Sequence, residues 1–141
     1  MPEVFETVFD PIRRVRVKLT PEERVRQSVV FHLTHALGYP PELISNECAI
    51  TVGKTLRRCD TVVFAPRDRT PLMILEYKAP EVPVSAKTVA QALEYNSVLS
   101  ARVIVVTNGR TMSVLRCHEG GGTQYLDAIP QYESLIGSDL S

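Results

Sequence analysis

Two short apolar runs in the middle of the chain, over residues 61–65 and 72–75, predict a pair of buried β-strands. Together they are rich in β-branched and aromatic residues, a composition typical of strands. The proline, arginine and aspartate residues between them indicate a turn. Because each run is apolar on both faces, we expect both strands to lie centrally in a sheet that is covered on two sides.

The turn between these runs sets the register of the pair. If it is centred on Asp68, antiparallel pairing places Ala65 opposite Pro71 and Asp60 opposite Glu76. Residues that face each other in this way have Cβ atoms about 4.5–5.5 Å apart. Two carboxylates at that distance repel each other, so we expect a cation to hold Asp60 and Glu76 at the end of the sheet.

Lys78 completes this group, because the strand period of two puts its side chain on the same face as Glu76. Mg²⁺ is commonly held by one or two carboxylates with waters and phosphate oxygens. A lysine beside it can orient or deprotonate an attacking water, or neutralise charge that develops on a phosphate. The pattern therefore points to metal-assisted hydrolysis of a phosphodiester. The alternative is a solvated strand end where the lysine pairs with the acids.

A helix start is indicated by Thr20, which suits the N-cap, and by Pro21 at the first helical position. We expect the helix to run to about residue 37. Glu23 stands three residues after the cap, where a capping box places an acid. Glu22 projects near the middle of the apolar stripe formed by Val25, Val29, Leu33 and Ala36.

An acid on the inward face of a helix needs a partner or a metal. We therefore take Glu22 as the active-site candidate of this helix and Glu23 as the capping residue. The alternative is that both acids simply favour the positive end of the helix dipole.

A third acid extends the predicted pair into a row. If Val52 pairs with Thr55 across a tight turn, Glu47 lies opposite Asp60, on the side away from Glu76. A slip of one residue at the turn would move Glu47 to the other face of the sheet. Glu47 is thus a further candidate for the metal site, directly or through its neighbours.

The remaining pattern predicts one domain with an N-terminal arm over residues 1–18, a core over 19–118 and a C-terminal extension over 119–141. Within the core we expect a helix from Ser85 to about residue 100 and strands over residues 45–52, 57–65, 102–107 and 111–117. In the extension we expect a short helix within residues 125–135. The strand over 102–107 follows a helix, so we expect it to run parallel to the strand that carries Glu76.

Composition narrows the class of protein. With 44% hydrophobic and 23% charged residues, the chain is typical of a globular domain. The formal net charge of zero does not favour a strongly cationic nucleic-acid binder. Neither an apolar run of membrane-spanning length nor a signal peptide is evident, so we expect a cytoplasmic protein without membrane contact, with its three cysteines reduced.

Nucleotide binding is not expected. Gly53, Lys54 and Thr55 match the end of a P-loop, but residue 48 is a cysteine where that motif requires glycine, and no helix is predicted to follow. We see no Walker motif in these 141 residues and so expect no ATP-driven motor from them.

Asp60 followed by Glu76-Tyr77-Lys78 resembles the core of the PD-(D/E)xK nuclease superfamily. More narrowly, the sequence resembles the N-terminal nuclease domain of type I restriction enzyme R proteins, in the short form found as a separate protein. The matching pieces run in order over about residues 9–110: Phe9-Asp10-Pro11-Ile12-Arg13, Leu19-Thr20-Pro21-Glu22-Glu23-Arg24-Val25-Arg26-Gln27, Gly38-Tyr39-Pro40, Arg58-Cys59-Asp60, Glu76-Tyr77-Lys78-Ala79-Pro80, Gln91-x-x-x-Tyr95 and Thr107-Asn108-Gly109.

This resemblance implies an α/β, restriction-endonuclease-like fold with an α-β-β-β-α-β core, a mixed sheet flanked by helices, and Mg²⁺-dependent cleavage of DNA. It implies catalytic roles for Asp60, Glu76 and Lys78, with Asp60 and Glu76 binding Mg²⁺ or Mn²⁺ and Lys78 assisting the water. It also makes Glu22 the matching first-helix acid.

The Gln-x-x-x-Tyr element, Gln91 and Tyr95, is implied to position or bind DNA. The partners expected are DNA, other restriction-modification subunits and a second copy of the chain. Two other readings stay open at this point. One is a nuclease-like module that binds DNA or a restriction-system partner without cutting, and the other is a structural or assembly domain.

Overall fold

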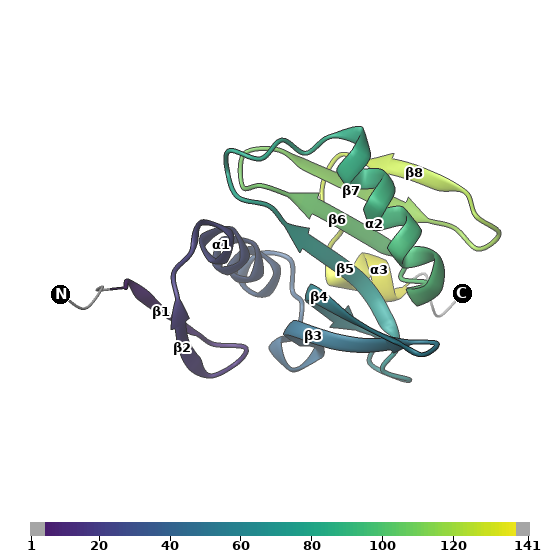
Figure 1. Cartoon of the computed structure of the whole chain (residues 1–141). Helices are drawn as coiled ribbons and strands as arrows, with labels where there is room; N and C mark the ends of the chain where they lie inside the picture. Colours follow the sequence, from purple (N-terminus) through teal and green to yellow (C-terminus); the bar gives the residue numbers. More distant parts are fainter. Residues whose placement is uncertain (1–4, 138–141) are drawn as a thin grey trace.

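A six-stranded mixed sheet with the strand order β3-β4-β5-β6-β7-β8 runs through the molecule (Figure 1). The structure is a computed structural model that describes residues 5–137, apart from the side chains of Val52 and Val98. Its elements in chain order are β1 (Thr7–Asp10), β2 (Val15–Lys18), α1 (Pro21–His35), the 3-10 helix η1 (Pro41–Leu43), β3 (Ile44–Val52), β4 (Thr55–Phe64), β5 (Pro71–Tyr77), α2 (Ala86–Leu99), β6 (Val103–Thr107), β7 (Met112–Cys117), β8 (Thr123–Leu126) and α3 (Tyr132–Gly137).

The topology of the central strands is the one that the apolar pattern predicts. Strands β3, β4 and β5 are antiparallel neighbours, and α2 then crosses over to β6, which pairs parallel to β5. Strands β7 and β8 extend the sheet in antiparallel fashion. The order α1-β3-β4-β5-α2-β6 confirms the expected α-β-β-β-α-β core.

Two predicted registers have different outcomes. The pairing of Val52 with Thr55 is confirmed. The predicted pairing of Ala65 with Pro71 was wrong, because Phe64 pairs with Pro71 instead. A register shift after Val63 accounts for the difference, since an irregularity adds a residue to one strand of the pair.

Helix α1 begins as predicted, with Thr20 Oγ1 accepting a hydrogen bond of 3.1 Å from the Glu23 amide. The prediction that Glu22 faces inward was wrong, because Glu22 is exposed and Glu23 is buried. The capping box is only half formed, since the Glu23 carboxylate binds the side chains of Arg13, Arg26 and Gln27. The inward face of α1 therefore carries charged residues as well as valines and a leucine.

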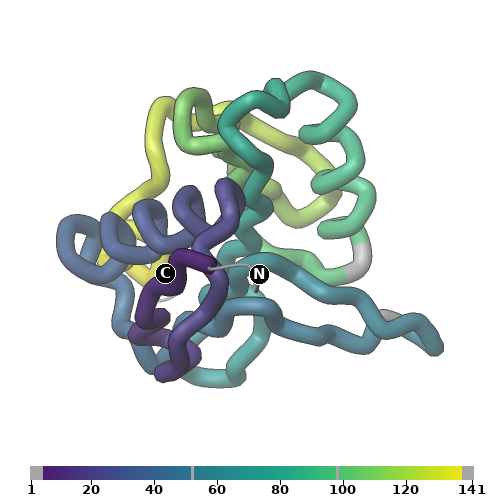
Figure 2. The backbone as a smooth tube through the Cα atoms, turned by 60° about the vertical axis from the view of Figure 1, so that its left-hand side comes forward, coloured from purple at the N-terminus to yellow at the C-terminus, as the bar shows by residue number. Residues whose placement is uncertain are grey.

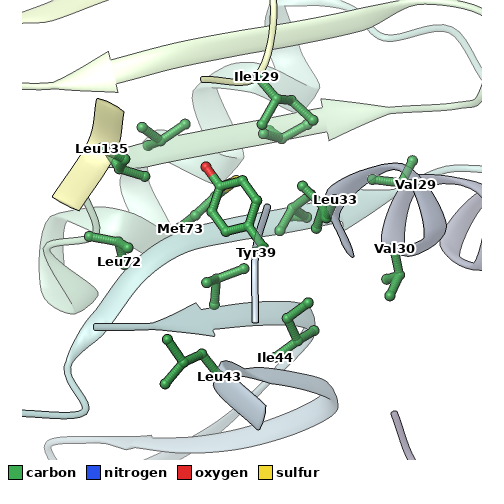
Figure 3. Close-up of a cluster of buried hydrophobic side chains, with 14 of the residues drawn as sticks. Val29, Val30, Leu33, Tyr39, Leu43, Ile44, Leu72, Met73, Ile129 and Leu135 are labelled. Atoms are coloured by element: carbon green, nitrogen blue, oxygen red, sulfur yellow. The ribbon is translucent and has the colours of Figure 1, made fainter. Parts of the chain in front are cut away.

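The helices lie on both faces of the sheet. On one face, Leu33 of α1 and Leu135 of α3 pack in a single apolar cluster with Val103 and Val105 of β6. Figure 3 shows Tyr39 within this cluster, and its hydroxyl donates a 2.8 Å hydrogen bond to the Pro130 carbonyl. Helix α2 contacts β6 from the other face, where the alternate strand side chains point.

Both ends of the chain differ from the expectation. The N-terminal arm forms the β1–β2 hairpin, which packs beside α1 and is linked to it by the 2.9 Å ion pair of Arg24 with Glu6 (Figures 1 and 2). The tail was expected to form only a helix, but it first adds β8 to the edge of the sheet and only then forms α3. The sequence also predicts that the last few residues, at the end of the chain, are disordered, but they lie outside the described part of the chain.

The β3–β4 hairpin reaches away from the rest of the molecule, as Figure 2 shows for its blue-to-teal segment. Its turn contains Gly53 with a φ of 61°, in the left-handed region that glycine adopts without strain. Within residues 5–137, no helix has the length and apolar character needed to span a membrane.

Candidate functional site

The acidic row predicted from the sequence runs across β3, β4 and β5. The β3–β4 register places Glu47 opposite Asp60. The pairing of Thr61 with Leu75 places Asp60 opposite Glu76. Glu47 has a φ of 55°, which is unusual for a residue with a side chain, and the direct ladder pair is interrupted there. The row is thus built at a point where the regular β geometry is broken.

Asp60 is the central member of the row and has little compensation for its charge. Its Oδ2 accepts a 2.8 Å hydrogen bond from the Tyr77 amide, and its Oδ1 lies 3.9 Å from Arg26 Nη2. Burial raises the pKa of Asp60, and the charges of Glu76 and Glu47 raise it further, against the hydrogen bond of Tyr77 and the charge of Arg26. A cation bound beside Asp60 would remove this penalty.

Glu76 and Lys78 lie beside Asp60 at the end of β5. Lys78 Nζ is 3.3 Å from Glu76 Oε1, and both side chains are partly exposed. The backbone of Lys78 is fixed by a 2.9 Å hydrogen bond from its amide to the Thr107 carbonyl of β6. The structure therefore brings Asp60, Glu76 and Lys78 together as the sequence predicts.

The first helix contributes a different acid from the predicted one. Glu23 is 7% exposed and accepts hydrogen bonds from Arg26 Nη1 and Gln27 Nε2, each of 2.9 Å. Arg26, itself buried, also donates to Glu47 through its other terminal nitrogen. Glu23 thus reaches the acidic row through Arg26, whereas the exposed Glu22 is not brought to it.

Sequence reasoning missed both Glu23 and Arg26 as parts of the site. A signal was present, because the two residues are three apart on one helix and so lie on the same side, where an acid and a base pair readily. Their burial was not visible in that spacing. The hairpin and β3 contribute the partners of these two side chains, Arg13 for Glu23 and Glu47 for Arg26.

An open cavity of about 500 Å³ lies between α2 and the strands β4 and β5. Asp60 and Glu76 line it from the sheet, and Gln91 and Tyr95 line it from α2. The structure therefore places the predicted Gln-x-x-x-Tyr pair beside the predicted catalytic acids. Arg57 also lines the cavity, with its guanidinium carbon 5.4 Å from the centroid of the Tyr95 ring.

Within residues 5–137, no cluster of three or more carboxylate, histidine or cysteine groups is arranged to hold a metal ion. Glu47 is paired with Arg26, and Glu76 is paired with Lys78. Asp60 and Glu76 both line the cavity, so these two carboxylates can bind a cation there. Two carboxylates are a sufficient protein contribution for Mg²⁺, which keeps several waters and binds phosphate oxygens of a substrate. The donor set fits Mg²⁺ bound together with a phosphodiester better than a cage built by the protein alone.

The arrangement provides three chemical elements in one place. A pair of opposed carboxylates can bind a hard divalent cation, and the ammonium group of Lys78 can interact with a phosphate oxygen or a water. The adjoining cavity offers an aromatic ring and an amide, which can stack on and hydrogen-bond to a base. Phosphodiester hydrolysis is a reaction that can use all three.

Two solved structures share this fold at low sequence identity. A fragment of a candidate HsdR subunit of a type I restriction enzyme from Vibrio vulnificus YJ016 aligns with 86% of this chain at a TM-score of 0.59 and 21% identity. A candidate nuclease of the DUF820 group from Anabaena variabilis ATCC 29413 aligns with 98% of this chain at a TM-score of 0.54 and 15% identity. The protein has the mixed α/β fold of these nuclease-like structures.

The aligned region is 88% of the Anabaena protein but 26% of the Vibrio fragment, so this chain spans about a quarter of the latter. The search of curated proteins found no match.

Residues 21–130 match the family described as type I restriction enzyme R protein N terminus, HSDR_N. This stretch is most of the chain and includes the whole acidic row, Lys78 and both cavity-lining residues of the Gln-x-x-x-Tyr element. The chain belongs to this family. The β1–β2 hairpin lies outside the matched stretch.

Proposed function

We propose that this protein is a metal-dependent DNA endonuclease that hydrolyses phosphodiester bonds. The observation that carries the proposal is that Asp60 and Glu76 line one cavity, with Lys78 paired to Glu76 and with Asp60 left short of positive charge. Membership of the restriction R-protein N-terminal family supports the same proposal, because the matched stretch, residues 21–130, contains all three residues.

In this proposal Asp60 and Glu76 hold Mg²⁺, with Mn²⁺ as an alternative ion. The metal would polarise the scissile phosphate and lower the pKa of an attacking water. Lys78 orients that water or neutralises charge on the phosphate, and Glu76 holds the ammonium group in place through their 3.3 Å contact. The Tyr77 amide fixes the orientation of the Asp60 carboxylate.

DNA is the proposed partner, with Gln91 and Tyr95 contacting it beside the reacting phosphate. Single-stranded DNA binds commonly by stacking of bases on aromatic rings, and Tyr95 provides such a ring on the cavity wall. Arg57 and Arg58 line the same cavity and supply positive charge near the phosphates, which the neutral composition of the whole chain does not reveal. Other subunits of a restriction system are proposed as further partners.

The test is cleavage of linear, supercoiled and single-stranded DNA with Mg²⁺ or Mn²⁺ and with a chelator. Wild type is compared with Asp60→Asn, Lys78→Ala and the surface control Glu119→Gln, all prepared in parallel. We expect metal-dependent cleavage by wild type and Glu119→Gln, and a loss of about 10²-fold or more in the two site variants.

The second candidate function is a module that binds DNA without cutting it. Equal cleavage by all four proteins would indicate a contaminating nuclease, and no cleavage by any would leave the catalytic reading without support. Fluorescence anisotropy with labelled DNA then asks whether the wild type binds and whether Tyr95→Ala weakens binding. The exposed guanidinium of Arg58 and the acids of the row make this binding sensitive to both salt and metal.

A further inference from the structure

The turn of the β1–β2 hairpin is organised around one buried carboxylate. Asp10, at the end of β1, is 0% exposed. Its Oδ1 accepts hydrogen bonds from the amides of Ile12 (2.7 Å) and Arg13 (3.1 Å), and its Oδ2 accepts from Arg13 Nε. Burial alone would raise the pKa of Asp10, but these hydrogen bonds and that of Asn46 lower it below its ordinary value. The carboxylate is therefore ionised and holds Arg13 in one orientation.

Arg13 links the hairpin to helix α1. Its Nη2 donates a 2.8 Å hydrogen bond to Glu23 Oε1, the same oxygen that accepts from Arg26 Nη1 at 2.9 Å. Gln27 occupies the other oxygen of Glu23. The Glu23 carboxylate is held from three sides, so the position of Arg26 is set in part by Arg13.

Arg26 then acts directly on the acidic row. While Nη1 binds Glu23, Nη2 donates to Glu47 and lies 3.9 Å from Asp60. Its guanidinium also lies 5.6 Å from the centroid of the Tyr77 ring. The planar fork of arginine can serve two carboxylates with different nitrogens, which the single ammonium of lysine does less well. Arg26 thus holds the Glu47 carboxylate and partly offsets the charge of Asp60.

A second chain of hydrogen bonds starts from the same aspartate. Asn46 Nδ2 donates to Asp10 Oδ2 at 3.0 Å, Thr61 Oγ1 donates to Asn46 Oδ1 at 2.7 Å, and the Tyr77 hydroxyl donates to Thr61 Oγ1 at 2.9 Å. All four of these residues are buried.

The other three residues of this second chain of hydrogen bonds are sequence neighbours of the acidic residues in the row. The neighbours are Asn46 beside Glu47 on β3, Thr61 beside Asp60 on β4, and Tyr77 between Glu76 and Lys78 on β5. One carboxylate in the hairpin is therefore connected to all three strands that carry the row.

We propose that Asp10 and Arg13 are positioning residues of the active site, so that the β1–β2 hairpin is a functional part of the nuclease. They act through Glu23 and Arg26 on the orientation of Glu47 and Asp60. The consequence for catalysis rests on the proposed function, but the positioning itself does not. The stretch that matches the family model, residues 21–130, begins after the hairpin, although the family resemblance seen in the sequence includes Asp10 and Arg13.

The hairpin provides a matched pair of arginines for the test. Arg13→Gln removes the contact with Glu23, and Arg13 is exposed enough, at 21% of its side chain, for the change to be tolerated. Arg16→Gln removes an arginine of β2 whose hydrogen bonds, within the described residues, go to Thr7 of the same hairpin. Arg13→Lys keeps the charge and tests rescue.

The first readout is NMR of the metal-free protein and needs no activity. The reporters are the Arg26 Nε–H, which is buried and donates to no acceptor within the described residues, and the Tyr77 amide, which donates to Asp60. We expect both signals to shift or broaden in Arg13→Gln, to stay at their wild-type positions in Arg16→Gln, and to lie between in Arg13→Lys. Thermal unfolding is measured alongside for all three.

The second readout is cleavage kinetics. Loss of groups that orient a metal site typically lowers activity by about 10–100-fold. We expect kcat of Arg13→Gln to fall about tenfold with KM changed by less than about twofold, and Arg16→Gln to keep wild-type values. A residue that only stabilises the fold would lower the amount of active protein at high temperature without this difference in kcat.

Three results would overturn the proposal: wild-type positions of both NMR signals in Arg13→Gln, equal shifts in Arg13→Gln and Arg16→Gln, or a kcat of Arg13→Gln equal to that of wild type. If Arg13→Gln does not fold, Arg13→Lys is measured in its place, and failure of both to fold would make the hairpin a folding element only. If the wild type cuts no DNA, the proposed function fails, and the NMR comparison still decides whether the hairpin positions the row.

Discussion

Two sets of charged side chains lie side by side at the end of the sheet, and they differ in how completely they are paired. Glu23 accepts hydrogen bonds from Arg13, Arg26 and Gln27, so its charge is fully satisfied. Asp60, which is more exposed, accepts one hydrogen bond from the Tyr77 amide, and its Oδ1 lies 3.9 Å from Arg26 Nη2.

The comparison separates charges that hold the fold from charges that are available for binding. A buried carboxylate with several donors stays ionised and fixes its partners, and losing one partner leaves an uncompensated charge. Burial raises the pKa of Asp60, and the charges of Glu76 and Glu47 raise it further, against the Tyr77 hydrogen bond and the charge of Arg26. A bound cation would stabilise the ionised form of such a carboxylate, and the proposed function uses this property.

The largest effect is expected for Glu23→Gln compared with Glu22→Gln. Removing the charge of Glu23 leaves Arg13 and Arg26 without their common partner, so we expect the free energy of unfolding to fall by about 3–5 kcal/mol. The exposed Glu22 has no such role, and Glu22→Gln should change it by less than about 0.5 kcal/mol. Urea unfolding followed by circular dichroism at pH 7 measures both. Equal losses in the two variants would remove the distinction between these neighbouring acids.

The second effect concerns metal ions and the Asp60 side of the comparison. A ligand that binds only the folded state at 100 times its dissociation constant stabilises by about 2.7 kcal/mol. We expect Mg²⁺ or Mn²⁺ to raise the unfolding temperature of wild type, and this increase to be lost in Asp60→Asn. The same increase in both proteins would place the ion at another site, and chelation should reverse any specific effect.

The smallest effect is a gain in stability from Asp60→Asn without metal. The change removes a like-charge contact across strands, a contribution of about 0.2–1 kcal/mol, and asparagine can still accept from the Tyr77 amide. The folded state raises the pKa of Asp60, so the ionised carboxylate destabilises the folded wild type. This loss of stability is complete above the raised pKa and absent below the unfolded pKa of about 3.9.

The gain from Asp60→Asn should therefore be largest near pH 7 and shrink as the pH falls through the raised pKa toward 4. Unfolding curves for the two proteins at a series of pH values measure it. A gain that grows on acidification would contradict the assigned direction of the pKa shift.

Strand pairing was predictable where a short turn fixed it. The two-residue turn at Gly53 and Lys54 aligned β3 with β4, and this alone set Glu47 opposite Asp60. The longer turn between β4 and β5 left room for the irregularity after Val63, which no periodicity shows. The predicted register near Glu76 was nevertheless correct, because the irregularity lies at the end of the strand pair next to the turn.

The choice between Glu22 and Glu23 failed for a different reason. The apolar stripe gives the direction of a side chain around the helix axis, but not what covers each turn. At the first turn of α1 the covering group is Arg13 of the β1–β2 hairpin. The strands of this hairpin are short and alternate weakly, so the hairpin was not predicted from the sequence. The edge strand β8 was missed similarly, since its residues are mostly exposed and gain strand structure only by pairing with β7.

The left-handed backbone at Glu47 has an evolutionary consequence. For a residue with a Cβ this conformation costs about 1–2 kcal/mol, and glycine would adopt it freely. A mutation to glycine would therefore make the isolated fold easier to form while deleting the carboxylate that Arg26 holds. Selection for stability alone would favour glycine at this position, so a glutamate retained here in related sequences would be a record of selection for function.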